Sequence, residues 1–164
     1  MKTHILLTAA LLLAASAAQA QHRHVHGEGR LDVAIDKDTI TLDLELPLDA
    51  AVGFERAPKH AREKAALAEA ERILNDAAAL WRPTPAAGCA VQSAAVGMPQ
   101  FDGGGHADID ASYVFRCAAP AALKSVETTL FKQFKRLYRL ETQRAGAAGQ
   151  GAQRLSPKNP VLNW

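Results

Sequence analysis

Apolar and polar residues alternate strictly in two neighbouring stretches of the chain, on either side of the short polar segment 36–39. The apolar positions of these stretches are Leu31, Val33 and Ile35, then Ile40, Leu42, Leu44 and Leu46. Because successive side chains of a strand point to opposite faces of a sheet, the pattern predicts an antiparallel hairpin with one buried face. Pro47 ends the second strand, since proline has no amide hydrogen to donate to a ladder.

Beyond Pro58 the apolar positions recur every three or four residues instead of every two. The apolar stripe of this stretch consists of Leu67, Ala70, Leu74, Ala77 and Trp81. This spacing predicts one long amphipathic helix between Pro58 and Trp81 that packs on the sheet. Pro58 suits the first helical turn, and Pro83 and Pro85 prevent continuation.

The second half of the chain repeats the order of two strands and a helix, and then adds two strands. We expect a strand at 88–96, a flexible loop at 97–105, a strand at 109–117, a helix from Pro120, a strand at 137–144, a turn-rich break at 146–151 and a short strand at 153–156. The helix after Pro120 is predicted from the spacing of Leu123, Val126, Leu130 and Phe134. The order strand-strand-helix-strand-strand-helix-strand-strand favours the α+β class, with two helices packed on one face of an antiparallel sheet.

The first twenty residues have the three-part layout of a secretory signal peptide. Met1-Lys2 gives a positive start, residues 5–15 form an apolar run, and Ala18-Gln19-Ala20 is a small-x-small cleavage site. The run is too short to span a bilayer, and no other stretch reaches the roughly 20 apolar residues that a membrane helix needs. We therefore expect export to the periplasm and a single domain over residues 21–164 without a membrane span.

Charge and cysteine content narrow the class further. The formal net charge is +2, and cleavage would remove Lys2 and leave +1, which argues against a nucleic-acid partner because such a partner requires a concentrated basic face. Cys89 and Cys117 are the two cysteines. In an oxidising compartment we expect them to form a structural disulfide, worth about 3–4 kcal/mol in the loop-closure account. A redox or metal-binding thiol pair is the alternative, but the chain has no CxxC spacing.

Candidate chemistry is concentrated near the start of the exported chain, in the segment His22-x-His24-x-His26. Alternate residues of an extended chain project to one side, so three imidazoles can converge on one ion. Neutral imidazole binds Zn²⁺, Cu²⁺ and Ni²⁺, and Glu28 continues the alternation as a further ligand. The competing interpretation is a solvated terminus whose histidines bind metal only incidentally.

A second group of polar residues follows the glycine-rich loop. His106 and Asp108 lie on the polar face of the predicted strand, where they either complete a mixed nitrogen and oxygen site or form an ordinary solvent-facing edge. Glu55 is either a ligand or a carboxylate that favours the approaching helix N-terminus. We expect His60 to be a surface residue because the neighbouring positive charges oppose a cation.

No enzyme motif stands out. The chain has no GxSxG elbow, no HExxH helix and no phosphate-cradling loop, since Gly103-Gly104-Gly105 lacks a following Lys-Ser/Thr. A three-histidine site is compatible with metal-dependent hydrolysis, but nothing positions a general base. The sequence therefore predicts a protein that is not an enzyme.

Four segments carry a family resemblance when they are taken together in order. They are His22-x-His24-x-His26-Gly27 leading into 29–35, Leu46-Pro47 followed by Val52-Gly53-Phe54-Glu55, His106-Ala107-Asp108-Ile109 running into Tyr113-x-Phe115-x-Cys117, and Leu130-Phe131 before Phe134. As a set they resemble the ZrgA-like family of bacterial periplasmic zinc-binding proteins. The resemblance implies zinc binding in the periplasm and a part in zinc acquisition alongside a dedicated importer. It matches His22, His24 and His26 to the N-terminal histidine motif, and His106 and Asp108 to the strand after the variable loop.

Two departures from the family pattern remove potential ligands. Such proteins commonly carry a histidine-rich stretch in the loop before that strand, whereas residues 97–105 contain no histidine. Arg56 stands where many relatives have histidine. We therefore expect a small-capacity zinc-binding accessory protein. The other hypotheses are an envelope structural or interaction protein with an incidental histidine tail, and a copper-binding protein, although Met98 is the one methionine after the signal segment.

Overall fold

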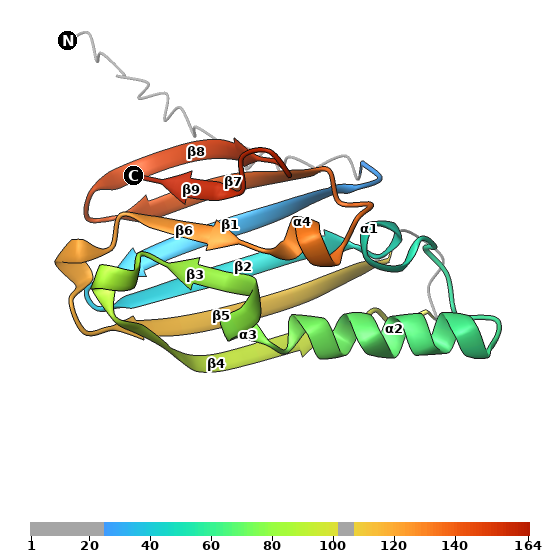
Figure 1. Ribbon diagram of the computed structural model, residues 1–164. Coiled ribbons are helices and arrows are strands. Elements are labelled where there is room, and N and C mark those ends of the chain that lie inside the picture. Colours follow the sequence, from blue (N-terminus) through green and yellow to red (C-terminus); the bar gives the residue numbers. More distant parts are fainter. Residues whose placement is uncertain (1–24, 102–106) are drawn as a thin grey trace, which may run out of the picture.

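A computed structural model describes residues 25–101 and 107–164 of the chain (Figure 1). A six-stranded sheet forms the body of the molecule. The strand order across this sheet is β4-β5-β2-β1-β7-β8. The bounds are β1 Glu28–Asp36, β2 Thr39–Pro47, β4 Cys89–Gly97, β5 Asp108–Cys117, β7 Arg139–Gly146 and β8 Gly149–Leu155. A smaller sheet has the order β3-β6-β9, with bounds β3 Trp81–Pro83, β6 Ser125–Thr128 and β9 Val161–Asn163. The mixed α+β class predicted from the sequence is confirmed, with strands predominating.

The hairpin predicted from the period-two pattern is confirmed as β1 and β2. The two strands pair antiparallel from Arg30 opposite Glu45 to Asp36 opposite Thr39, and Lys37 takes a positive φ of 53° in the turn between them. The expectation of an antiparallel sheet is wrong at one place, because β1 pairs with β7 in parallel. The chain makes a long excursion after β2 and enters β7 at the same end at which it entered β1.

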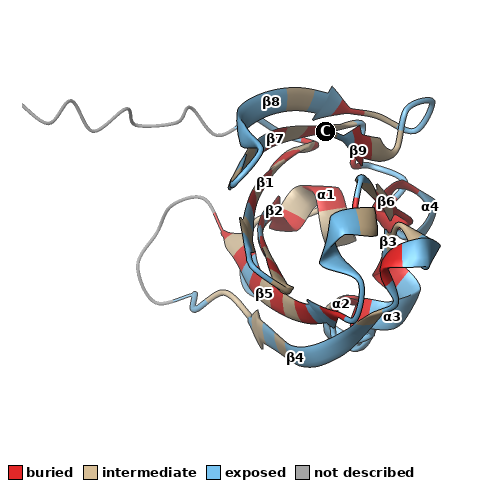
Figure 2. Ribbon diagram, turned by 90° about the vertical axis from the view of Figure 1, so that its left-hand side faces the viewer, coloured by how far each residue is buried: buried red, intermediate tan, exposed pale blue. Residues whose placement is uncertain are grey.

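The sheet curls around one side of the molecule, and its concave face holds the core (Figure 2). Trp81 and Tyr113 are among the largest fully buried side chains, with ring centroids 5.6 Å apart. The hydroxyl of Tyr113 donates a hydrogen bond of 2.9 Å to the carbonyl of Leu74, at the end of helix α2 (Ala61–Leu74). This contact fastens the long helix to the sheet.

The single long helix predicted up to Trp81 is wrong in its second part. Helix α2 ends at Leu74, a separate turn α3 (Ala77–Leu80) follows, and Trp81 begins β3. The break occurs because the side chain of Asp76 accepts a hydrogen bond from the amide of Ala79 and so caps a new helix.

The helix predicted after Pro120 is also wrong. The segment contains a 3₁₀ turn η2 (Pro120–Ala122), strand β6 and only one helical turn, α4 (Leu130–Gln133). Strand β6 pairs with β3 on one side and β9 on the other, which supplies its backbone groups with partners that a helix would have provided internally. The packing of two long helices on one face is therefore replaced by one long helix and a small sheet.

The disulfide and helix α1 (Leu48–Val52) lie at opposite ends of the large sheet. Cys89 and Cys117 lie directly opposite each other on β4 and β5 and form the predicted disulfide. The pattern of apolar residues predicted no element between Pro47 and Pro58, but this segment contains helix α1. Among the described residues, no helix is long and apolar enough to cross a membrane.

Candidate metal centre

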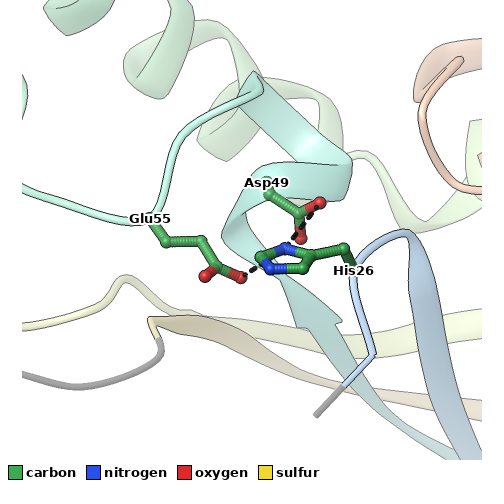
Figure 3. Close-up of side chains that lie close together, drawn as sticks. All are labelled: His26, Asp49 and Glu55. Carbon is green, nitrogen blue, oxygen red and sulfur yellow. Dashed lines mark ion pairs between the residues drawn. The ribbon is translucent and has the colours of Figure 1, made fainter.

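Three side chains with metal-binding atoms meet where the chain enters β1, at the end of the sheet beside helix α1 (Figure 3). His26 comes from the turn before β1, Asp49 from α1, and Glu55 from the loop that follows α1. Nδ1 of His26 lies 3.3 Å from Oδ2 of Asp49 and 3.4 Å from Oε1 of Glu55. One ligand atom from each residue lies within 4.8 Å of the other two.

These separations suit the edge of a tetrahedral zinc site. Nitrogen and oxygen ligands at about 2.0–2.1 Å from Zn²⁺ lie roughly 3.3–3.4 Å from one another. Both contacts of the His26 nitrogen have this length. The donor set of one imidazole and two carboxylates is chemically suited to zinc.

The turn that carries His26 is shaped by Gly27. Gly27 has a positive φ of 74°, and a Cβ at this position would lie 2.7 Å from the carbonyl oxygen of Arg136 and 2.8 Å from the ring of Tyr138. Its carbonyl accepts a hydrogen bond of 3.0 Å from the amide of Tyr138. A side chain at residue 27 would therefore displace the neighbouring imidazole of His26.

The two carboxylates are brought together by a reversal of the chain at Gly53. The amide of Gly53 donates to the carbonyl of Asp49 at 2.8 Å, and its φ of 87° ends helix α1 in the left-handed conformation. Glu55 therefore returns toward Asp49 after only two further residues. Helix α1 is itself anchored, because the amide of Leu48 donates to the carbonyl of Ala107 beside β5.

Burial sets the electrostatics of this group. The side chains of Asp49 and Glu55 are only 20% and 17% exposed, whereas that of His26 is 68% exposed. The second oxygen of Asp49, Oδ1, is buried and accepts no hydrogen bond from any described residue. A buried carboxylate oxygen without a donor costs free energy, and a bound cation would remove that cost.

A family-level sequence profile described as "ZrgA family zinc uptake protein" matches residues 23–164. The chain belongs to the ZrgA family. The match covers all three residues of the group, and it confirms the family resemblance found in the sequence. A comparison with curated proteins found no significant match. A zinc-related role is therefore established by family membership.

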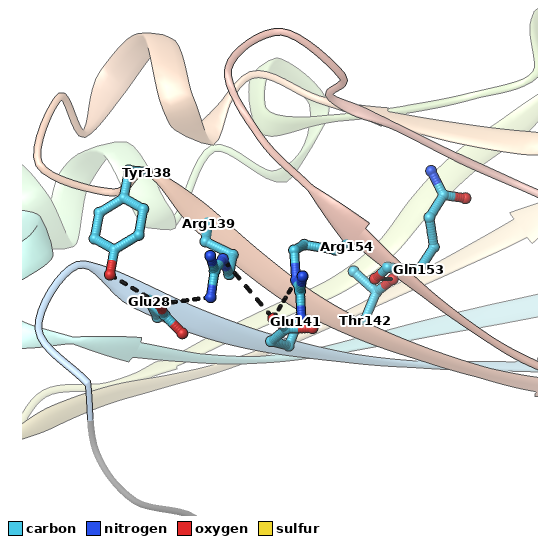
Figure 4. Close-up of polar contacts among 7 residues, drawn as sticks. All are labelled: Glu28, Tyr138, Arg139, Glu141, Thr142, Gln153 and Arg154. Atoms are coloured by element: carbon cyan, nitrogen blue, oxygen red, sulfur yellow. Dashed lines mark hydrogen bonds and ion pairs between the residues drawn. The ribbon is translucent and has the colours of Figure 1, made fainter.

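Glu28, the predicted fourth ligand, points to a different set of partners in this ZrgA family protein (Figure 4). Its Oε1 accepts hydrogen bonds of 2.8 Å from the hydroxyl of Tyr138 and from the guanidinium of Arg139. The hydrogen bond from Tyr138 to this carboxylate raises the pKa of the phenol. Glu28 is not one of the three grouped residues, and its role as a metal ligand stays a prediction.

Arg56, at the position where histidine is expected in many ZrgA relatives, is held by a carboxylate of helix α2. Its guanidinium makes two hydrogen bonds to Glu63, of 2.8 and 2.7 Å, and lies over the ring of Phe54. Arg56 and a hydrogen bond from the backbone amide of Lys59 together lower the pKa of Glu63 to about 2. These contacts fix the backbone on the C-terminal side of Glu55.

The other histidines and Asp108 lie outside the group of His26, Asp49 and Glu55 or outside the described residues. His22, His24 and His106 lie outside the described residues. Asp108 begins β5 and pairs with Pro47, which precedes Asp49 by two positions. Asp108 is not one of the grouped residues. His60 is exposed beside Glu63, with 3.4 Å between Nε2 and Oε1.

Asp49 is the site residue that sequence reasoning missed. It lies in a stretch for which the sequence pattern predicted no strand or helix, so nothing indicated where its carboxylate would point. The available signal was an acidic residue two positions after Pro47, since proline favours the start of a helix and acidic residues favour the first turn. Gly53 was a second available signal, because glycine commonly ends a helix.

Proposed function

We propose that this protein is a periplasmic zinc-binding accessory protein that captures Zn²⁺ at His26, Asp49 and Glu55 and delivers it to an importer. The observation that carries the proposal is the meeting of these three donors at the spacing of neighbouring zinc ligands. Membership of a zinc uptake family supports the same conclusion.

The charge of the group suits a single divalent ion. Two carboxylates and one neutral imidazole balance the charge of Zn²⁺, and the buried Oδ1 of Asp49 gains a partner. Tetrahedral zinc requires a fourth ligand, which water or a further side chain supplies. His22, His24, His106 and Asp108 are our predicted sources. Glu28 would have to release Tyr138 and Arg139 to join them.

The exposure of His26 supports delivery rather than permanent storage. The carboxylates lie at the base of the group and the imidazole lies at its solvent side. An acceptor can therefore approach the ion from solvent and replace ligands one at a time. Imidazole also binds Cu²⁺ and Ni²⁺, so the selectivity among these ions is part of the test.

Equilibrium dialysis of the purified protein against Zn²⁺, Cu²⁺ and Ni²⁺ tests the proposal. We expect one tightly bound zinc ion, and loss of most of that affinity in His26→Ala. The matched control is His60→Ala, an exposed histidine that lies beside Glu63 instead of the grouped residues. Equal zinc binding by the wild type and His26→Ala would overturn the site.

A second comparison separates the role of the N-terminal histidines from that of His26. The variant with His22, His24 and His26 all changed to alanine is dialysed beside the single His26→Ala variant. A further loss in the triple variant assigns ligand roles to His22 or His24. Equal residual binding would contradict those two predictions and leave His26 as the histidine of the site.

A further inference from the structure

We propose that the free edge of β4 pairs antiparallel with β4 of a second copy of this chain, which would join two six-stranded sheets across a two-fold axis. An edge strand presents unpaired backbone N–H and C=O groups, and natural proteins usually protect such edges with charges, proline, a bulge or a covering segment. The proposal follows from how differently the two edges of this sheet are treated. It does not depend on zinc binding.

The opposite edge, β8, has two forms of protection. The side chain of Gln153 donates to the carbonyl of Val161 at 2.7 Å and accepts from the amide of Asn163, so strand β9 lies against β8. Arg154 adds a charge to the strand and is paired with Glu141 at 2.7 Å. This edge is therefore both tied to another element and charged.

The edge at β4 has neither protection among the described residues. Its sequence, CAVQSAAVG, contains no charged residue, although each of the other five strands of the sheet contains at least one. A bulge between Val91 and Ser93 protects only the part of the edge that precedes Ser93. From Ser93 to Gly97 the pairing with β5 is regular, which leaves five residues with an open outer side.

Exposed apolar side chains gather at the two ends of the same strand. Val91 is 39% exposed, and Phe101, four residues beyond the end of β4, is 36% exposed. An antiparallel two-fold pairing brings the Val91 end of one strand beside the Phe101 end of the other. Both apolar groups would then be covered by the same contact.

The neutrality of β4 favours a second copy as the occupant. Two identical charged strands would place like charges opposite each other, which is destabilising, whereas a neutral strand meets itself without this cost. A partner of opposite charge would find nothing on β4 to recognise. The small residues Ala94 and Ala95 also allow a second strand to approach closely.

Sedimentation equilibrium of the purified protein tests the pairing. A contact through one edge strand is small, so we expect weak dimerisation, with the mass rising from monomer to dimer between about 10 and 500 μM. Ala95→Lys introduces like charges close to the axis and should weaken dimerisation at least about tenfold. Residue 95 is exposed on the outer face opposite Ser112, so the substitution should leave the fold of the monomer intact.

The matched control is Ala152→Lys, which places the same charge on the same outer face at the β8 edge. It should leave the dimerisation constant unchanged. Hydrogen exchange of the wild-type amides from 93 to 97 gives an independent measurement that requires no variant, and their protection should rise with protein concentration. A wild type that stays monomeric up to about 1 mM, or an equal effect of the two lysines, would overturn the proposal.

Discussion

Two groups of polar side chains meet at the start of β1, and they differ in which residues face the negative charge of their carboxylates. In one, Glu28 accepts hydrogen bonds from Tyr138 and from Arg139, which supplies the opposite charge (Figure 4). In the other, Asp49 and Glu55 both face the imidazole of His26, and one oxygen of Asp49 is buried without a hydrogen-bond donor from the described residues (Figure 3). Only one residue, Gly27, separates His26 from Glu28. A carboxylate paired with arginine stabilises the fold, whereas the buried oxygen of Asp49 would gain a partner when a cation binds.

Of the substitutions that test this difference, Asp49→Asn should have the largest effect on zinc affinity. Zinc affinity should fall by more than the roughly 10–100-fold that loss of an outer-shell partner costs, because a direct ligand is removed. The free energy of unfolding of the metal-free protein should stay the same or rise, since a buried charge is lost. Chelator competition measures the first quantity and urea denaturation in EDTA measures the second. A large loss of metal-free stability with normal zinc binding would assign Asp49 a purely structural role.

Glu28→Gln should have the opposite profile and a smaller effect. The amide keeps the shape of the side chain but loses the charge opposite Arg139, so the free energy of unfolding should fall by about 1 kcal/mol. Zinc affinity should be unchanged if Glu28 belongs to the structural cluster. The same two measurements apply. A tenfold or greater loss of zinc affinity would instead support the prediction that Glu28 is a ligand.

Glu63→Gln should have the smallest effect, and it tests a third carboxylate that is paired with an arginine, as Glu28 is. The pKa of Glu63 is lowered to about 2 by Arg56 and the amide of Lys59, so its stabilising contribution is present above about pH 4.5 and lost as the pH falls through 2. The melting temperature of the wild type should therefore fall more steeply than that of the variant between pH 4.5 and 2. The effect is modest because the pair is exposed to solvent.

Calorimetry across this pH range measures the difference, and Glu71→Gln is the matched control on an exposed position of the same helix. Parallel curves for the wild type and Glu63→Gln would mean that the Arg56–Glu63 pair adds nothing to stability. In that case the segment around Glu55 would be held in place without a contribution from the Arg56–Glu63 pair.

Most of the strands of the large sheet could be predicted because their information is local, although residues 149–151 of β8 lie in the segment that was expected to be a turn-rich break. Alternation at Leu31, Val33 and Ile35 depends only on which face is buried, and the same holds for β5. The disulfide followed from the compartment and from strand positions that a hairpin makes adjacent. Such features depend on neighbours in sequence or on one repeated ladder, which a linear pattern records.

The features that could not be predicted depend on tertiary contacts. The stripe through Val126 and Leu130 has helical spacing, yet β6 forms because β3 and β9 offer it hydrogen bonds from distant parts of the chain. The parallel contact of β1 with β7 has no local signature either. Of the proposed site, the sequence indicated His26 and Glu55. Asp49 escaped because its significance depends on where α1 is placed.

The parallel pairing of β1 with β7 has a consequence for how the protein comes into being. The turn carrying His26 is held by Tyr138, and the adjacent Glu28 is held by a side chain 110 positions further along the chain. If the protein is exported as we propose, the histidine emerges early from the membrane, but the strand that orients it is missing until most of the sequence has emerged. Contacts of such long range form late, since closing a large loop is entropically slow. If His26 binds zinc as we propose, the nascent protein would present no finished site, and ion capture would begin only with the completed chain.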